Sequence, residues 1–454
     1  MSMHQSRSFV IICCLILILG ILAYAFITDT NTEVLSKEEI QTNIQAQEGK
    51  DLGYKYISSY LKKYGIGNIN EYKLNIIEEQ LETDFYQELP TEYDMAKTIC
   101  ELYLEYFYED TDVNDKVAVT DAVLHCLFAA LGDPYAYYRP AKEFDDYITS
   151  LGGTDSFVGI GVMLDAKTLE VIMVYKDSGA EQAGIRHGDF IYGVEGKTVE
   201  DTSTDELMNM LKGEIGTTVN ITVKRGDDLI DVVATRLQLN QRSVTYEIDD
   251  NNIGYIYVSQ FLGTTDTQFR EAVDFCTENG AVALVIDMRY NPGGLVSAQA
   301  NMVDYLVPDS EDRIITSYEQ SGTNYVYKTS DGHHVDIPIA VICNGGTASA
   351  AELFTAALRD FSDMGIIDAV TVGTTTYGKG VIQTSYEIYD GSGLTYTIGY
   401  CNPPSGVNYH GVGIIPDVPA DENQGANPIE IAKNEVLKLV NKNSGVMEIY
   451  DAAA

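Results

Sequence analysis

The sequence predicts a multidomain protein of mixed α/β and α+β class, and three features of its 454 residues support this. An uncharged apolar run near the N-terminus is long enough to span a bilayer. A stretch with amphipathic, helical spacing follows over Tyr54–Leu131. Beyond residue 250, short buried strands alternate with helices, which is the order of an α/β layer. A chain of this length can hold two or three domains with substantial cores.

The chain is strongly acidic, with 29 Lys and Arg against 68 Asp and Glu and a net charge of −39. Such a charge repels nucleic acid, and no basic patch or RNA-binding motif offsets it. The hydrophobic content of 45% is that of a globular protein rather than of a disordered one. Nucleic acid is therefore excluded as a partner.

The apolar run near the N-terminus is Phe9–Ile27, which carries no charge and follows Arg7. We expect residues 1–28 to be an uncleaved membrane anchor with its N-terminus inside the cell. The alternative is a secretory signal, because Ala23-Tyr24-Ala25 fits an A-x-A cleavage site and would leave Phe26 as the first residue. Both interpretations place the rest of the chain outside the cytoplasm.

Residues 29–150 are expected to form a polar stalk and a region of amphipathic helices. The last of these helices ends at Leu131-Gly132-Asp133-Pro134-Tyr135, where turn residues accumulate.

Residues 151–236 have their own pattern, in which short strands alternate with turns. A short helix is expected at Ser178–Ile185, and Ser203-x-x-Glu206 is a capping box that opens a second helix. Together with V-G-I-G-V at 158–162, this pattern resembles a PDZ domain. The resemblance implies a β-rich domain with two helices that binds the C-terminus of a peptide.

In that resemblance, backbone N–H groups of Gly159, Ile160, Gly161 and Val162 would hold a peptide carboxylate. Leu207 and Leu211 of the second helix would form apolar pockets for the last side chains of the peptide. The alternative is an ordinary glycine-containing turn without a ligand. We also expect Arg225 to bridge this domain to the domain that follows.

The stretch that organises the rest of the chain is Val341–Gln383. Ile339–Cys343 is a short apolar run typical of a buried strand, and Asn344-Gly345-Gly346 breaks it. Helical spacing begins at Ala350, so Ser349 lies at a strand-to-helix turn, where unpaired N–H groups are available. A helix cap is the simple interpretation of such a serine, and a nucleophile is the functional one.

Two further segments favour the nucleophile. Lys379 lies between two glycines and is the only charged residue in Thr371–Gln383, so a desolvated amine could act as a base toward serine. Gln383 could orient that amine. Upstream, D-M-R-Y-N-P-G-G at 287–294 follows another buried strand, and its Gly293 and Gly294 N–H groups are candidate oxyanion donors.

The motifs D-x-R-x-N-P-G-G, T-A-S-A-A-E and Y-G-K-G-x-x-Q resemble, in this order, those of the carboxy-terminal processing peptidases. These are serine peptidases with a Ser–Lys dyad, and the resemblance extends from about Lys116 to Val418. It implies that Ser349 is the nucleophile, Lys379 its base and Gln383 the residue that orients the base. It further implies that N–H groups of Ala350 and Gly293 form the oxyanion hole.

This sequence departs from the family in two places. Ala351 stands where the family often has a second serine, and the segment between Ser349 and Lys379 is a few residues longer than usual. Neither departure removes a chemical group from the dyad.

The resemblance also sets the expected domain limits. Residues 237–426, with part of 100–150, would form the peptidase core around a mixed sheet, and 427–454 a C-terminal helix and tail. The helical N-terminal region would mediate homodimer contacts. Because the seven cysteines include no C-x-x-C pair and no His/Cys cluster, we expect no metal, no cofactor and no structural disulfide.

The function that we expect is that of a membrane-anchored, extracytoplasmic serine endopeptidase. Its PDZ domain would capture free C-terminal tails for cleavage through an acyl-enzyme. The alternative is a catalytically inactive, membrane-anchored PDZ adaptor that binds tails without cutting them. A Ser–His–Asp protease is excluded, because the sequence lacks a suitable His and a G-x-S-G-G turn.

Overall fold

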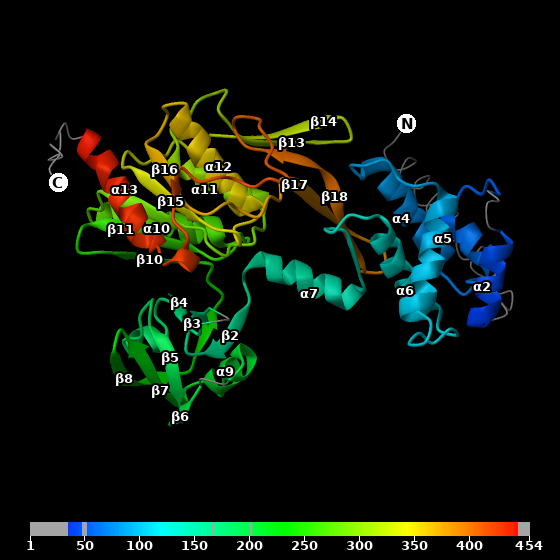
Figure 1. The fold of residues 1–454 in the computed structure, drawn as a ribbon, viewed down its shortest axis with the longest axis horizontal. Coiled ribbons are helices and arrows are strands. Elements are labelled where there is room, and N and C mark those ends of the chain that lie inside the picture. The colour runs from blue at the N-terminus through cyan, green and yellow to red at the C-terminus, as the bar shows by residue number, and fades with distance from the viewer. Residues whose placement is uncertain (1–34, 48–51, 166–167, 200–201, 444–454) are drawn as a thin grey trace, which may run out of the picture. The chain divides into compact units, whose positions relative to one another are not determined.

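The computed structural model describes residues 35–47, 52–165, 168–199 and 202–443 (Figure 1). It divides into two compact units, Met1–Tyr138 and Arg139–Ala454, and the short strand β1 (Tyr137–Arg139) lies at their boundary. The predicted anchor, residues 1–28, falls outside the described ranges. Within those ranges, no helix combines the length and the apolar composition needed to cross a bilayer.

The first unit is built from helices, which confirms the predicted helical region. Three of them have a capped first turn, in which the side chain of Asn70, Thr91 or Asp115 accepts a backbone N–H bond. Leu61, Ile77 and other apolar residues on facing sides of the helices form the core. The elements are α2 (Lys37–Ala46), α3 (Ile57–Tyr64), α4 (Glu71–Asp84), α5 (Glu92–Leu102), the π-helix η1 (Tyr103–Phe107) and α6 (Lys116–Ala130).

Glu78 of α4 is a buried carboxyl group in this helical unit, with a relative exposure of 4%. Both of its oxygens accept the N–H of Ile57, at 3.2 and 3.1 Å. Burial raises the pKa of Glu78 to about 8, the Ile57 N–H opposes this rise, and the nearby carboxylates of Glu82 and Glu92 add to it. Near neutral pH this group is therefore largely protonated in the folded protein.

We expect the helical unit to lose stability as pH rises from about 5 to 8, and Glu78→Gln to remove most of that loss. The folded-state pKa of Glu78 is higher than its ordinary value of 4.5, so the folded chain holds more protons in this pH window. The effect is on the order of a few kcal/mol, at about 1.4 kcal/mol per pKa unit. Hydrogen exchange of α3 and α4, corrected for intrinsic rates, measures it. Glu88→Gln, at an exposed position, is the control; equal pH dependence in both variants would contradict the assignment.

The second unit begins with α7 (Ala141–Gly152) and continues into a β-rich domain with two helices, the architecture predicted for this part of the chain, whose strands run from Ser156 to Asn240. Strands β6, β5, β7 and β8 form a four-stranded sheet in that order, and β3 pairs with β4. The elements are β2 (Ser156–Gly159), β3 (Val162–Leu164), β4 (Val171–Val174), α8 (Gly179–Gln182), β5 (Phe190–Val194), β6 (Lys197–Thr198), α9 (Thr204–Leu211), β7 (Thr218–Arg225), β8 (Asp228–Thr235) and β9 (Leu237–Asn240).

The first and last strands of this domain pair with each other. β2 and β9 are antiparallel, with Ser156 opposite Asn240 and Gly159 opposite Leu237. Just outside the strands, the Gln241 N–H donates to the Asp155 carbonyl at 2.7 Å. The domain is therefore joined to the rest of its unit by a stem of two paired strands.

The expected bridge through Arg225 is wrong. Its guanidinium binds Asp189 at 2.7 Å and the Gly184 carbonyl at 2.8 Å, both within the same domain. Asp189 is almost fully buried, so it offers a strong, local partner to the arginine. Arg225 is the last residue of β7, and two further strands of the same domain follow it.

The rest of the second unit contains a six-stranded mixed sheet in the order β10-β11-β12-β15-β16-β19. β11, β12, β15, β16 and β19 run parallel, whereas β10 is antiparallel to β11. The strands are β10 (Val244–Ile248), β11 (Ile253–Val258), β12 (Ala283–Asp287), β15 (Ile339–Cys343), β16 (Ala369–Gly373) and β19 (Val418–Pro419). The helices are α10 (Thr265–Glu278), α11 (Val296–Leu306), α12 (Ala350–Asp363), the 3₁₀ helix η2 (Glu422–Gln424) and α13 (Pro428–Asn443).

Each face of this sheet packs on a core of its own. Along β12, Leu284 and Ile286 pack in the core that contains residues of α10, α11 and α12, and Val285 packs in the core that contains Ala432 and Val436 of α13. The strand period of two explains this alternation. Continuous apolar strands such as Ile339–Cys343 follow from burial on both faces.

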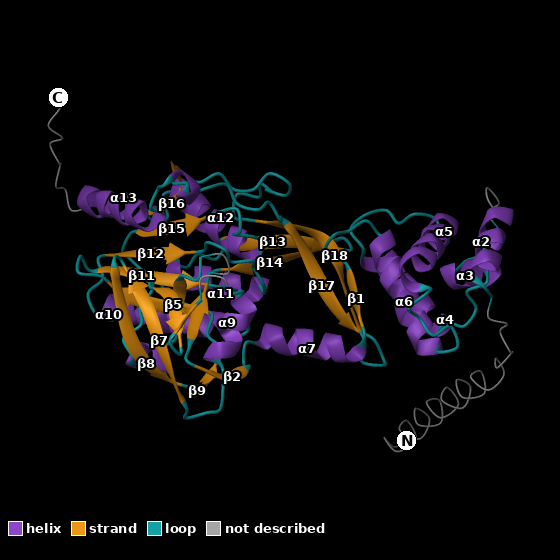
Figure 2. Ribbon diagram, turned by 60° about the horizontal axis from the view of Figure 1, so that its bottom comes forward, coloured by secondary structure: helices purple, strands orange, loops and turns teal. Residues whose placement is uncertain are grey.

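A second sheet borders the helices α11 and α12. It contains the hairpin β13 (Ile314–Gln320) and β14 (Thr323–Lys328), and β17 (Val381–Glu387) paired antiparallel with β18 (Gly393–Asn402), a pair visible in Figure 2. β13 joins β18 through Ser317 opposite Asn402. The sheet places β17, which follows Lys379, beside the turn that holds Ser349.

Candidate active site

Ser349 lies where the sequence places it, after β15 and directly before α12. Its backbone has φ +56° and ψ −118°, a left-handed region that non-glycine residues rarely adopt. The Ser349 N–H donates to the Glu352 carboxylate at 2.8 Å, and Gly293 packs against its other side. The surrounding contacts therefore hold the serine in a strained turn, which is the kind of turn that presents a nucleophile at the end of a strand.

Glu352 connects the two segments of the predicted dyad. This carboxylate is fully buried, and its Oε1 accepts the Thr376 hydroxyl at 2.5 Å and the Gly378 N–H at 2.7 Å. Its Oε2 accepts the N–H of Ser349 and the N–H of Lys379, both at 2.8 Å. One side chain thus fixes the backbone of the nucleophile and the backbone of the base. Glu352 was not among the residues predicted to act in the site, although a glutamate three residues after a helix-capping serine is the capping-box pattern.

Ser349, Lys379 and Gln383 line one open cleft of about 460 Å³. Gly294, Leu353 and Tyr409 line the same cleft. The three residues that the sequence analysis assigned to catalysis are therefore brought together, although they come from a helix N-terminus, a glycine-rich loop and a strand.

Gln383 makes a hydrogen bond across the β17–β18 pair. Its Nε2 donates to the Thr397 hydroxyl at 3.1 Å, and Thr397 is fully buried. This bond fixes the orientation of the amide. Its role in orienting the Lys379 amine stays a prediction.

Gly293 lies very close to the nucleophile. Its φ is +99°, and a Cβ at this position would lie 2.8 Å from the Ser349 Cβ and 2.9 Å from the Ala350 nitrogen. Its N–H donates to the Asn291 carboxamide oxygen at 2.9 Å. An oxyanion at this place would have to compete with Asn291 for that N–H, whereas the Ala350 N–H is at the first position of α12.

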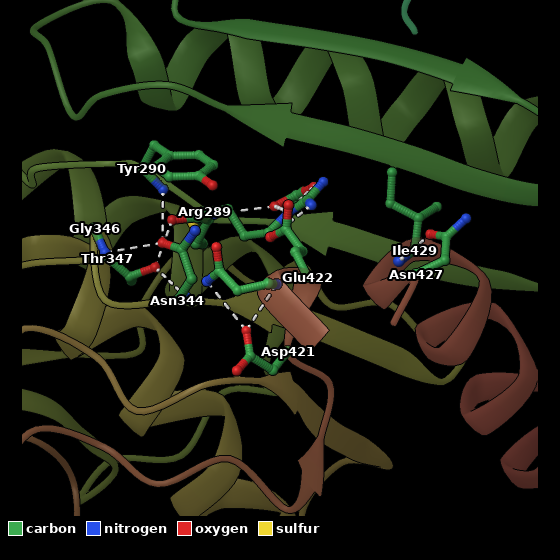
Figure 3. A network of polar contacts seen from close by, with 12 residues as sticks. Arg289, Tyr290, Asn344, Gly346, Thr347, Asp421, Glu422, Asn427 and Ile429 are labelled. Atoms are coloured by element: carbon green, nitrogen blue, oxygen red, sulfur yellow. Dashed lines mark hydrogen bonds and ion pairs between the residues drawn. The ribbon is translucent and has the colours of Figure 1, made fainter. Parts of the chain in front are cut away.

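The loop of residues 288–294 and the loop of residues 344–350 are joined by several bonds. The Asn344 carboxamide oxygen accepts the N–H of Tyr290 at 3.1 Å and the N–H of Gly346 at 2.9 Å, as Figure 3 shows. The Thr347 hydroxyl donates to the Met288 carbonyl at 2.8 Å. These bonds make the loop that carries Gly293 and the loop that carries Ser349 one unit.

Arg289 anchors the first of these loops. It binds the fully buried carboxylate of Asp287 at 2.6 Å and Glu422 of η2 at 3.0 Å. The Tyr255 hydroxyl donates to Asp287 at 2.8 Å. A cleft of about 580 Å³ borders Arg289 and Glu422, but Ser349 and Lys379 do not line it.

Two other groups near the dyad are held in their protonated forms. Burial raises the pKa of the Cys343 thiol to about 12, and Cys343 ends β15 as a core residue. Burial raises the pKa of Tyr409 well above its usual range, and the nearby Glu352 charge adds to this. Tyr409, which was not among the predicted site residues, donates its hydroxyl hydrogen to the Ser349 carbonyl oxygen, with 3.4 Å between the two oxygens. Because its thiol stays protonated, Cys343 does not compete with Ser349 as a nucleophile.

The residues proposed to bind a peptide in the β-rich domain are mostly internal. Ile160, Val162, Leu207 and Leu211 are buried in its core. A Cβ on Gly161 (φ +84°) would lie 2.4 Å from the Ser178 Cβ and 2.9 Å from Leu239 Cδ1. Packing alone therefore explains this glycine, and the binding of a carboxylate by Gly159–Val162 stays a prediction.

Comparison with known proteins identifies two domains, both of them in the second unit. A model of peptidase family S41 matches residues 252–420, and a PDZ domain model matches residues 156–235. The carboxy-terminal processing protease CtpA of Bacillus subtilis (strain 168) is 34% identical over 321 residues, which are 69% of this chain and 66% of that protein. A probable CtpA-like serine protease of Staphylococcus haemolyticus (strain JCSC1435) is 33% identical over 304 residues, 66% of this chain and 59% of that protein.

A similar fold is found in the crystal structure of a putative S41 protease from Bacteroides fragilis NCTC 9343. The TM-score is 0.52 at 16% identity, with 82% of this chain and 98% of that chain covered. The likeness at this identity concerns the fold alone. The alignments span 59% and 66% of the two curated relatives' own lengths.

Proposed function

Because the chain belongs to the S41 family of carboxy-terminal processing proteases and carries a PDZ domain, we propose that it is a serine endopeptidase that cleaves protein tails. The observation that carries this proposal is the cleft lined by both Ser349 and Lys379, whose backbones are tied to one buried carboxylate, Glu352. An adaptor that only binds tails has no need for this arrangement.

The reaction that we propose is acyl transfer to Ser349 followed by hydrolysis. Lys379, as a neutral amine, takes the proton of the Ser349 hydroxyl while the oxygen attacks the carbonyl of the tail. The Ala350 N–H stabilises the oxyanion that forms, and so does the Gly293 N–H once it leaves the Asn291 carboxamide oxygen. The amine then gives its proton to the leaving nitrogen, and a water molecule hydrolyses the acyl-enzyme.

The membrane attachment, the capture of the substrate and the assembly of the protein belong to the same proposal. We propose that residues 1–28 anchor the protein in the membrane with the catalytic part outside the cytoplasm, that the PDZ domain captures free C-termini, and that the helical region forms homodimer contacts. The apolar composition of Phe9–Ile27 after Arg7 supports the anchor.

The test of the proposed function is a search for the acyl-enzyme. Purified full-length protein is incubated with an unfolded tail peptide, quenched in acid, digested and analysed by mass spectrometry. We expect cleaved peptide and an acyl mass on the fragment that contains Ser349, with EDTA having no effect. A tail that binds but is neither cut nor transferred to Ser349 would favour the adaptor instead.

For the PDZ domain, we expect amidation of a tail's C-terminus to weaken its binding about tenfold or more. An amide cannot accept the charge-assisted bonds that a carboxylate forms with backbone N–H groups, which are worth about 1.5–3 kcal/mol. Fluorescence anisotropy with the Ser349→Ala protein measures this without cleavage, and acetylation of the opposite end of the peptide is the control. Equal affinities of the free and amidated tails would leave Gly159–Val162 as an ordinary turn.

A further inference from the structure

The peptide group between Ser349 and Ala350 supplies one of the N–H groups proposed to bind the oxyanion. This N–H belongs to Ala350, the first residue of α12, where the helix itself offers it no acceptor. The carbonyl of the same peptide group belongs to Ser349 and accepts the Leu353 N–H at 3.0 Å. Because a peptide group is planar, a contact that fixes the direction of this carbonyl also fixes the direction in which the Ala350 N–H points.

Tyr409 is a second donor to the Ser349 carbonyl. The two oxygens lie 3.4 Å apart, and the tyrosine lines the catalytic cleft. Burial raises the pKa of the phenol well above its usual range, so the hydroxyl is protonated and can donate near neutral pH. The residue is 6% exposed and belongs to an apolar cluster with Leu353, Ala356, Cys401 and Ile414.

The segment of residues 408–411, which carries this tyrosine, is also fastened to the loop of the predicted base. The Asn408 carboxamide donates to the Gly380 carbonyl at 2.9 Å. The Gly411 N–H donates to the Gly378 carbonyl at 2.8 Å. These two glycines flank the base, so the position of the tyrosine is fixed relative to both members of the dyad.

We propose that Tyr409 is a positioning residue of the peptidase reaction, whose hydroxyl holds the Ser349–Ala350 peptide group so that the Ala350 N–H points to the oxyanion. This inference rests on the proposed function and adds a residue to its machinery. The Gly293 N–H is bonded to the Asn291 carboxamide oxygen, so more of the stabilisation of an oxyanion falls to the Ala350 N–H.

The length of the bond from Tyr409 explains why its effect should appear in the chemical step. At 3.4 Å the bond is long and contributes little to the resting protein. When the Ala350 N–H donates to an oxyanion, the peptide group becomes more polarised and its carbonyl oxygen becomes a better acceptor. The bond from the tyrosine therefore strengthens as the oxyanion forms, which stabilises the transition state more than the bound substrate.

The first test removes the hydroxyl alone. Tyr409→Phe keeps the ring in its apolar cluster, and we expect kcat for a tail peptide to fall about fivefold, as for one lost hydrogen bond, with KM changed less than twofold. Tyr318→Phe removes a hydroxyl from another tyrosine that packs against the same cluster and should leave both constants unchanged. Thermal unfolding verifies that both variants are folded. An unchanged kcat in Tyr409→Phe, or an equal loss in the control, would overturn the proposal.

The second test measures binding of a transition-state analogue to the full-length protein. A tail peptide that ends in an aldehyde is compared with the same peptide ending in the corresponding alcohol. The Ser349 hydroxyl adds across the aldehyde C=O and leaves an oxygen at the place of the oxyanion, whereas the alcohol forms no such bond. We expect Tyr409→Phe to weaken binding of the aldehyde about fivefold and of the alcohol less than twofold.

Equal losses for the two peptides, or no loss for the aldehyde, would overturn the positioning role of Tyr409. Failure of the proposed function has a different signature, because the unaltered protein would then neither cleave the tail nor bind the aldehyde more tightly than the alcohol. That outcome would overturn the peptidase function and this inference with it.

Discussion

Replacing either Ser349 or Lys379 by alanine is expected to lower kcat/KM for an unfolded tail by at least about 10⁴-fold. The two side chains act as a unit in acyl transfer, so loss of either removes the covalent route. For the same reason, the double variant should be little worse than either single variant. Product formation is measured by mass spectrometry, and folding by circular dichroism.

The matched controls are Ser150→Ala and Lys142→Ala, which replace an exposed serine and an exposed lysine of α7. Both control variants should retain activity. Substantial hydrolysis by the purified Ser349→Ala or Lys379→Ala protein would show that other groups perform the reaction.

Glu352→Gln is expected to lower kcat by about 10²- to 10³-fold and to lower the free energy of unfolding by about 3 kcal/mol. One carboxylate oxygen serves Thr376 and Gly378, and the other serves Ser349 and Lys379. A glutamine amide has only one acceptor oxygen, so its NH₂ group must face one of these pairs of donors. In either orientation, two buried donors lose their partner.

Because Glu352 positions the dyad through the backbone, the substitution should change kcat far more than KM. Steady-state kinetics and thermal unfolding separate the two effects, and Glu278→Gln on the exposed surface of α10 is the control. A fully active, less stable Glu352→Gln protein would reduce this residue to a purely structural role.

Local sequence patterns were sufficient to predict the strand and the helix on either side of Ser349. The apolar run Ile339–Cys343 and the helical spacing from Ala350 predict β15 and the start of α12 at the residues where they occur. Such elements are bounded by glycine or polar turns, which fix their ends within a few residues.

Contacts between distant segments could not be predicted in this way. Glu352 reaches Gly378 and Lys379 across an intervening strand, and Arg225 pairs with Asp189 rather than with another domain. Gly161 fits a ligand-binding motif, yet its neighbours Ser178 and Leu239 already forbid a side chain there. Sequence spacing indicates which residues could take part in a site. The residues that contact a buried charge or a buried glycine depend on the packing of the whole domain.

The stem formed by β2 and β9 makes the PDZ domain an interchangeable module. Its two ends are adjacent, and Asp155 and Gln241 are already joined by a hydrogen bond. A domain attached in this way can be gained, lost or exchanged in evolution without rerouting the chain that carries it. The same attachment makes the stem the mechanical link between the two parts, because a torque on the PDZ domain reaches the remainder of its unit through this pair of strands.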